Sequence, residues 1–207
     1  MKKFRLLFIS LVVSVCAANA QTASITDTLL FDSLEERNGW TEMSYKKKSD
    51  VEQNTKKGFI TLKSKAKKIV SYNAKTHCFT DLNVDANFFV TCSVDANGIK
   101  AGNMVGMMFD YMDDMNFSVV GIDNKHAYFQ KYSEGKLVGE MICLFHVKKK
   151  HSAMWELGIR NTDGKLEFVV NEQVAFDLRH RELVSGGIGF YTYGKQTAKF
   201  HDLTIMQ

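Results

Sequence analysis

Apolar side chains recur at every second position in many short segments of the chain, and this alternation restricts the fold more than any other feature. It is clearest in NFFVTCSVD, where Phe88, Val90, Cys92 and Val94 share one phase. Further segments with this period are Ile60–Leu62, Val105–Tyr111, Phe117–Val119, Trp155–Ile159, Leu166–Val170, Val174–Phe176 and Ile188–Phe190. A strand places alternate side chains on opposite faces, so this pattern predicts antiparallel strands with one buried face.

Turn-forming sequences separate these segments. Ser133–Lys136 (SEGK) and Asn161–Lys165 (NTDGK) have the composition of hairpin connections. A total of about a dozen strands favours two packed sheets. Because the chain contains no proline, exposed sheet edges must be protected by lysines and β-bulges. We therefore expect an all-β fold, a two-sheet antiparallel β-sandwich, that forms one domain over residues 21–207.

An acidic stretch interrupts the alternation between Gly106 and Ile122. The spacing of Asp110, Asp113, Asp114 and Asn116 does not match the ligand pattern of a calcium loop. Asp and Asn are favoured in turns because their side chains bond the local backbone. We interpret the stretch as two strands joined by a simple turn.

The first 20 residues have the features of a secretory signal peptide. A basic start, MKKFR, precedes the apolar run Leu6–Ala17, and the sequence ANA fits cleavage after Ala20. The run is shorter than the ~20 residues that a membrane span needs. We expect a secreted, periplasmic or cell-surface protein without a membrane span, and a lipoprotein acylated at Cys16 is the alternative.

The charge balance gives no reason to expect a nucleic-acid partner. Cleavage after Ala20 leaves 24 basic residues against 23 acidic ones. Lysines cluster at positions 46–48, 56–57, 63–68 and 148–150. No aromatic residues are interleaved with these clusters, as a groove for single-stranded nucleic acid would require. We interpret the clusters as solvated loops or edges, with a patch for acidic glycans as the alternative.

Three cysteines follow the signal peptide, namely Cys78, Cys92 and Cys143. We expect Cys92 to be a buried small apolar residue because it shares the phase of its strand, with a Cys78–Cys92 disulfide as the alternative. The spacing of the cysteines and histidines fits neither a zinc site nor a recognisable nucleophile arrangement.

Several segments together resemble one known fold family. They are VGMMFDYMDDMNFSVVGI, HAYFQKYSEGKL, WELGIRNTDGKLEFVVNEQVAF and SGGIGFYTYGKQTAKFHDLTIMQ, preceded by LLFDSLEERNGWTE with Trp40. The chain is similar over most of residues 28–207 to the concanavalin A-like (laminin G-like, glycosidase family 16-like) β-jelly roll. It departs from that family at Asn171-Glu172, where an Asn-Gly turn is usual.

The resemblance implies a carbohydrate-related function without a recognisable catalytic site. Enzymes of this family carry an E-x-D-x-E strand, which places carboxylates on one face across a glycosidic bond. No segment has this pattern, since Glu156 stands alone on its strand and Asp110 is at a strand end. We expect an exported, lectin-like, carbohydrate-binding module. The alternatives are a glycoside-hydrolase-like enzyme with a divergent site and a cell-envelope interaction or structural domain.

Two strands offer aromatic and polar side chains on a single face. Sugar sites combine flat aromatic surfaces with polar groups that fix orientation. Alternation places the candidates opposite the apolar phase, and the resemblance implies that their strands line the concave sheet. The predicted ligand-binding residues are His126, Tyr128, Gln130, Tyr132, Tyr191 and Tyr193. The alternative is that the tyrosines are half-buried strand residues whose hydroxyl groups are hydrated.

The last strand changes phase near its middle. Ala198 and Phe200 follow one phase, whereas Leu203 and Ile205 follow the other, which predicts a β-bulge at His201-Asp202. The resemblance further implies a structural calcium near the terminal strands, with Asp202 as its side-chain ligand. A role in the bulge alone is the alternative for Asp202.

Overall fold

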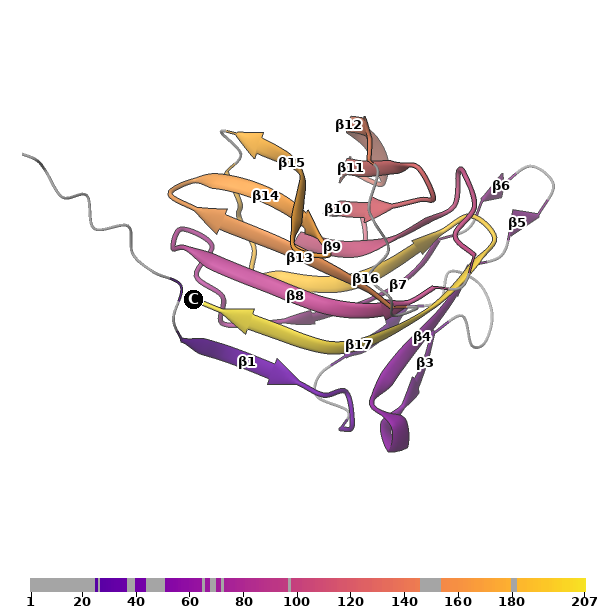
Figure 1. Ribbon diagram of the computed structural model, residues 1–207, viewed down its shortest axis with the longest axis horizontal. Helices are drawn as coiled ribbons and strands as arrows, with labels where there is room; N and C mark the ends of the chain where they lie inside the picture. Colours follow the sequence, from indigo (N-terminus) through magenta and orange to yellow (C-terminus); the bar gives the residue numbers. More distant parts are fainter. Residues whose placement is uncertain are drawn as a thin grey trace, which may run out of the picture.

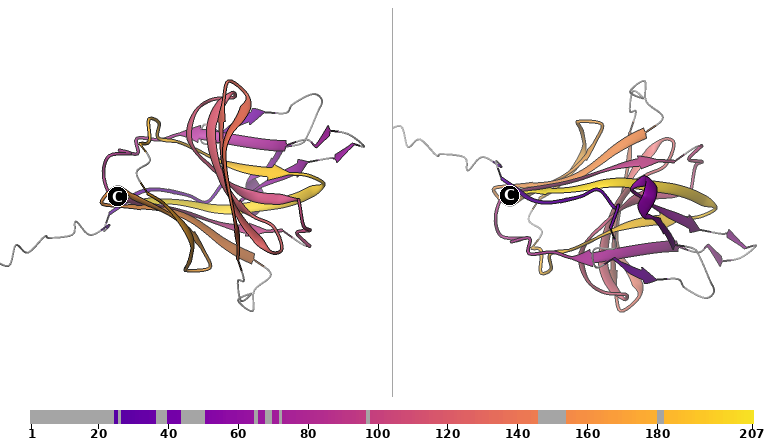
Figure 2. Two further views of the ribbon diagram at one scale, coloured as in Figure 1. Left: turned by 90° about the horizontal axis from the view of Figure 1, so that it is seen from above. Right: turned by 90° about the horizontal axis from the view of Figure 1, so that it is seen from below.

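The computed structural model describes residues 25, 27–36, 40–43, 51–64, 66–67, 70–71, 73–96, 98–145, 154–179 and 182–207. The expected signal peptide and Cys16 lie outside these residues, as do the lysine clusters at 46–48 and 148–150. Within them, two antiparallel sheets lie face to face as two layers (Figures 1 and 2). The predicted two-sheet antiparallel β-sandwich is confirmed. No helix in the described ranges is long and apolar enough to cross a membrane.

The first sheet has eight strands in the order β15-β14-β13-β8-β17-β4-β3, with β1 paired to β17. Its strands are β1 (Thr28–Asp32), β3 (Val51–Asn54), β4 (Phe59–Ser64), β8 (Phe88–Asp95), β13 (Met154–Thr162), β14 (Lys165–Val170), β15 (Gln173–Arg179) and β17 (Gln196–Met206). A short 3-10 helix, η1 (Thr55–Lys57), joins β3 to β4 and carries one of the predicted lysine clusters.

The second sheet has seven strands in the order β12-β11-β10-β9-β16-β7-β2. Its strands are β2 (Thr41–Met43), β7 (Asn73–Phe79), β9 (Met104–Asp113), β10 (Asn116–Ile122), β11 (His126–Ser133), β12 (Lys136–Leu144) and β16 (Gly187–Tyr193). Figure 1 shows β8 and β17 of the first sheet in front of β9 and β16 of the second. A separate hairpin consists of β5 (Ala66–Lys67) and β6 (Val70–Ser71).

The main core fills the space between the two sheets. All four residues of the predicted apolar phase in β8 are buried in it. Phe190 of β16 stacks on Phe200 of β17 with ring centroids 4.5 Å apart. Trp40 stacks on the same Phe190 at 4.7 Å, and its Nε1 donates a hydrogen bond of 2.8 Å to Asp32 of β1. The opening segment is thereby fixed to the strands that close the chain.

The predicted β-bulge in the last strand is confirmed. Phe200 and Leu203 are both fully buried although they belong to opposite phases. The pairing of β17 with β8 shifts between His201 and Thr204, and Asp202 adopts a positive φ of 45°. The irregularity keeps the apolar residues on both sides of it in the core.

Two phase predictions are wrong. The alternation placed Tyr111 beside Phe109 in the core, but Asp110 has a left-handed φ of 50° and turns Tyr111 to the outer face of its sheet. The alternation also placed Val174 beside Phe176. Phe176 is buried but Val174 is 45% exposed, because the pairing of β14 with β15 contains a register shift.

The acidic stretch between β9 and β10 is a hairpin turn, as predicted. Asp113 Oδ1 accepts hydrogen bonds from the backbone nitrogens of Met115 at 2.7 Å and Asn116 at 2.9 Å. The predicted hairpin connections at Ser133–Lys136 and Asn161–Lys165 also join consecutive strands, β11 to β12 and β13 to β14.

Cys78, Cys92 and Cys143 are all free thiols. Cys92 is buried in the core, as predicted, and the alternative Cys78–Cys92 disulfide is not formed. Burial, together with the charge of Asp32, raises the pKa of Cys78 to about 12. This thiol therefore remains protonated in the folded protein and is a poor nucleophile.

Candidate functional site

The outer face of the seven-stranded sheet carries all six residues predicted to bind a ligand. In β11, Ala127 and Phe129 point into the main core, so the alternate residues lie on the outer face. In β16, Ile188 and Phe190 point inward in the same way. The outward residues are His126, Tyr128, Gln130 and Tyr132 of β11 and Tyr191 and Tyr193 of β16. β10 and β9 lie between these strands in the sheet, so the two groups are not immediate neighbours.

A second apolar cluster joins the two groups, and we call this surface the aromatic face. It is formed by the buried residues Met104, Met108, Tyr111, Phe117, Val119 and Tyr191, with Tyr128, Tyr132 and Tyr193 packed against them and partly exposed. Tyr191 is fully buried and shares a hydrogen bond with Tyr132. The Tyr132 ring in turn stacks on Phe117 with centroids 4.8 Å apart. Tyr191 therefore forms a floor, whereas Tyr128, Tyr132 and Tyr193 reach the surface.

Asp123, in the turn between β10 and β11, fixes two of the predicted residues. It is 4% exposed and accepts hydrogen bonds of 2.7 Å from the Tyr128 hydroxyl and from the backbone nitrogens of Lys125 and His126. His126 Nδ1 lies 3.2 Å from both carboxylate oxygens, which orients the ring and leaves Nε2 for another partner. Burial alone would raise the pKa of Asp123, but the hydrogen bonds together hold it at about 2.

The remaining polar groups of β11 form a strip that continues onto β12. The Tyr132 hydroxyl donates to Gln130 Oε1 at 3.1 Å, and Gln130 Nε2 donates to Glu140 Oε1 at 2.8 Å. Glu140 is exposed, and Gln130 is partly exposed. Hydrogen-bonding groups therefore run beside the exposed edges of the tyrosine rings.

A buried lysine closes the other side of the aromatic face. Lys75 of β7 is 4% exposed, and its Nζ donates to the carbonyl oxygen of Asp114 at 2.9 Å and lies 4.1 Å from the centroid of Phe117. The Tyr111 hydroxyl donates to Asp114 Oδ1 at 2.8 Å, and the Tyr111 ring stacks on His77 at 4.0 Å. Burial lowers the pKa of Lys75, which the charge of Asp114 partly opposes. These contacts hold the β9–β10 turn against β7.

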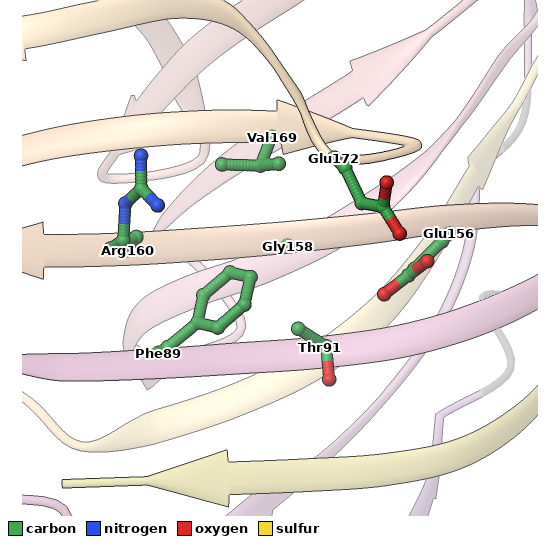
Figure 3. Close-up of a pocket in the computed structure, with 7 residues that line it drawn as sticks. All are labelled: Phe89, Thr91, Glu156, Gly158, Arg160, Val169 and Glu172. Carbon is green, nitrogen blue, oxygen red and sulfur yellow. The ribbon is translucent and has the colours of Figure 1, made fainter. Parts of the chain in front are cut away.

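A hollow of about 140 Å³ lies on the outer face of the other, eight-stranded sheet (Figure 3). Around Gly158 it is lined by Phe89, Thr91, Glu156, Arg160 and Glu172. The residues come from β8, from β13 and from the turn after β14, so only the pairing of these strands brings them together. No sequence pattern pointed to this hollow.

Asp202, the predicted calcium ligand, is exposed at the bulge of β17. Across the parts of the chain that the structure describes, no three or more His, Cys, Asp or Glu side chains come together to hold a metal ion. A structural calcium at Asp202 stays a prediction that depends on backbone oxygens for its other ligands.

Two carboxyl groups beside the aromatic face, Asp113 and Asp123, have lowered pKa values. Hydrogen bonds lower the pKa of Asp113, and the largest contribution comes from the Asn116 side chain; hydrogen bonds lower the pKa of Asp123 as well. Both groups are therefore suited to accepting hydrogen bonds. Hydrolysis by a carboxyl pair needs one group with a raised pKa that can donate a proton. Asp113 and Asp123 do not meet that requirement.

Comparison with solved structures identifies the fold. The carbohydrate-binding module CBM66 from Bacillus subtilis matches 82% of this chain and 96% of its own length, with a TM-score of 0.53 and 15% identity. The Bacillus licheniformis β-glucanase matches 89% of this chain and 100% of its own length, with a TM-score of 0.59 and 9% identity. The carbohydrate recognition domain of Emp47p matches 85% of this chain and 93% of its own length, with a TM-score of 0.57 and 14% identity.

The fold is therefore the concanavalin A-like jelly roll, as the sequence resemblance implied. It is a fold on which both carbohydrate-binding domains and glycoside hydrolases are built. No protein-family model and no curated protein matches the chain. Identity of this level shows the architecture, and the function has to be argued from the residues of this chain.

Proposed function

We propose that the chain is an exported carbohydrate-binding module and that it contacts a glycan with the β11 side of its aromatic face. The observation that carries the proposal is the fixing of His126 and Tyr128 by the buried Asp123. Both side chains are partly exposed, and both are oriented before any ligand arrives. Prior orientation lowers the entropic cost of binding.

The chemistry of this surface fits a sugar ring. The apolar C–H face of a sugar can pack on the exposed parts of Tyr128 and Tyr132, while its hydroxyl groups bond to polar atoms beside them. His126 Nε2 and the Glu140 carboxylate are the groups available for those bonds. Tyr191 supports the surface from below and takes no direct part.

Binding without hydrolysis is the form of the proposal that the residues favour. The sequence has no E-x-D-x-E strand, and the lowered pKa values of Asp113 and Asp123 disfavour proton donation by these groups. The solved neighbours include binding modules, recognition domains and a β-glucanase, so they support a carbohydrate ligand without separating binding from hydrolysis. The proposal includes export with cleavage after Ala20. N-terminal sequencing of the exported protein would check this, because the mature chain should begin at Gln21.

The test is calorimetric titration of the purified protein and its variants with glycans found in an array screen. Tyr128→Ala and His126→Ala should each weaken binding by about tenfold or more. Phe31→Ala is the control, because it removes a ring that is 61% exposed on β1 of the other sheet. Unchanged affinity in both test variants, or an equal loss in the control, would contradict the proposal.

A further inference from the structure

The hollow on the eight-stranded sheet exists because residue 158 is glycine. Gly158 pairs with Thr91 of β8 on one side and with Val169 of β14 on the other. A Cβ atom at this position would lie 2.7 Å from Phe89 Cε2, so any side chain would displace the Phe89 ring. The missing side chain lets the edge of the Phe89 ring lie close over the backbone of β13, and the ring and this backbone form a floor that accommodates the apolar face of a sugar.

Groups of different charge stand on opposite sides of this floor (Figure 3). On one side Arg160 lies over Phe89, with Cζ 5.9 Å from the ring centroid, and its Nε donates to Glu167 Oε2 at 2.9 Å. Glu167 also pairs with Lys165, which lies 3.7 Å from Asp177, so Arg160 belongs to a network of two cations and two carboxylates within the sheet. On the other side lie the carboxylates of Glu156 and Glu172. Two carboxylates therefore line the end of the hollow that lies away from Arg160.

Glu172 adopts a backbone conformation that favours glycine. It follows Asn171 in the two-residue turn between β14 and β15, and the φ angles of the pair are 47° and 67°. Asn-Gly is the preferred sequence for such a turn, because a residue with a Cβ atom is strained in the left-handed region. The departure from Asn-Gly therefore adds a carboxylate to the hollow at a cost in backbone energy.

We propose that this hollow is a second ligand site and that it binds an amino-sugar unit of a glycan. The protonated amino group lies between Glu156 and Glu172, because hydrogen bonds between charged partners are stronger than neutral ones. The ring packs on Phe89, and a hydroxyl group bonds to Thr91. A hollow of about 140 Å³ takes one sugar ring rather than a chain, and an acidic group between the two carboxylates would be repelled by them.

The proposal is tested with two probes of equal length, an oligomer of glucosamine and an oligomer of N-acetylglucosamine. Each is titrated calorimetrically into the purified protein at about pH 6 and low ionic strength. The glucosamine oligomer should bind at least about tenfold more tightly than its acetylated counterpart. Glu156→Gln and Glu172→Gly should each weaken that binding by about tenfold.

Stability measurements separate lost binding from lost folding. Glu172→Gly should raise the Tm by about 2 to 4 °C, because glycine suits the left-handed turn. Glu134→Gly is the matched control, since Glu134 has a φ of 51° in the β11–β12 turn and the substitution removes the same charge far from the hollow. It should raise the Tm similarly and leave binding unchanged.

Three outcomes would overturn the proposal. Equal affinity for the two oligomers would remove the role of the amino group. A loss of binding in Glu134→Gly as large as that in Glu172→Gly would show that the loss comes from the change in the protein's net charge and not from the hollow. A loss in Tyr128→Ala with unchanged binding in Glu172→Gly would assign the ligand to the aromatic face. The two sites lie on different sheets, so failure of one leaves the other standing.

Discussion

Replacing Asp123 tests how the aromatic face is built, because this one carboxylate holds parts of three segments. Its Oδ1 accepts from the backbone nitrogens of Lys125 and His126, each at 2.7 Å. Its Oδ2 accepts from the Tyr128 hydroxyl at 2.7 Å and from the Gly102 nitrogen at 3.2 Å. Asp123→Ala removes these bonds, whereas Asp123→Asn keeps the shape of the side chain and one acceptor oxygen.

The expected loss in the free energy of unfolding follows from the three hydrogen bonds of 2.7 Å. With about 1 kcal/mol for each of three bonds, and water replacing part of what is lost, Asp123→Ala should lower the free energy of unfolding by about 3 kcal/mol. Asp123→Asn should lower it by about 1 to 2 kcal/mol. A protein of this size loses about 2 to 4 °C in Tm per kcal/mol, so the expected decreases are about 6 to 12 °C and about 2 to 8 °C.

The effect should depend on pH with a definite sign. The pKa of Asp123 is about 2 in the folded protein, below the ~3.9 of an unfolded aspartate. The ionised carboxylate therefore stabilises the fold above about pH 4, and this contribution is lost as the pH falls toward 2. Allowing for solvent screening, it amounts to about 1 to 2 kcal/mol.

Thermal unfolding of the wild type and both variants, followed by circular dichroism between about pH 6 and pH 2.5, measures these quantities. The Tm gap between the wild type and Asp123→Asn should narrow below about pH 4. Two results would refute the reasoning. One is an Asp123→Ala variant with the same Tm as the wild type at neutral pH. The other is a Tm difference between the wild type and Asp123→Asn that is the same at every pH.

Three further predictions concern the rest of the fold. Phe200→Ala should lower the free energy of unfolding in urea by about 3 to 5 kcal/mol, since it empties a fully buried site, and a loss below about 1 kcal/mol would contradict the packing. In the native protein a thiol reagent should modify the partly exposed Cys143 and spare Cys78, whose pKa burial raises to about 12, as peptide mass mapping would show. Lys75→Met should change the free energy of unfolding in urea by less than about 1 kcal/mol, because burial already disfavours the charged lysine and Asp114, its partner, remains partly exposed. A larger loss would show that the ion pair stabilises the fold.

The sequence predicted the sandwich because its strands keep one apolar phase over several residues. In a strand such as β8, whose apolar phase is buried throughout, the core-facing side chains can be assigned without knowledge of the neighbouring strands. The bulge at Asp202 was predictable for the same reason, since apolar residues mark the phase on both sides of it. Tyr111 was placed on the wrong face because the left-handed Asp110 changes the phase inside a continuous apolar run.

The parts of the candidate sites that escaped prediction depend on pairing between strands. Asp123 looks like any aspartate in a turn, and only the structure shows that its carboxylate reaches Gly102 in another loop. Tyr191 has the phase of an exposed residue, but the cluster around Phe117 covers it. The departure at Glu172 was visible in the sequence, whereas its proximity to Glu156 required the pairing of β13 with β14.

The central proposal is that the protein binds a glycan through the aromatic face without hydrolysing it. The most direct measurement is a glycan-array screen of the wild type and Tyr128→Ala, with reducing-sugar release assayed on every glycan that binds. The account predicts binding of the wild type to at least one glycan, no release of reducing sugar, and loss of that binding in the variant. Release of reducing sugar, or an identical array pattern for the two proteins, would contradict it.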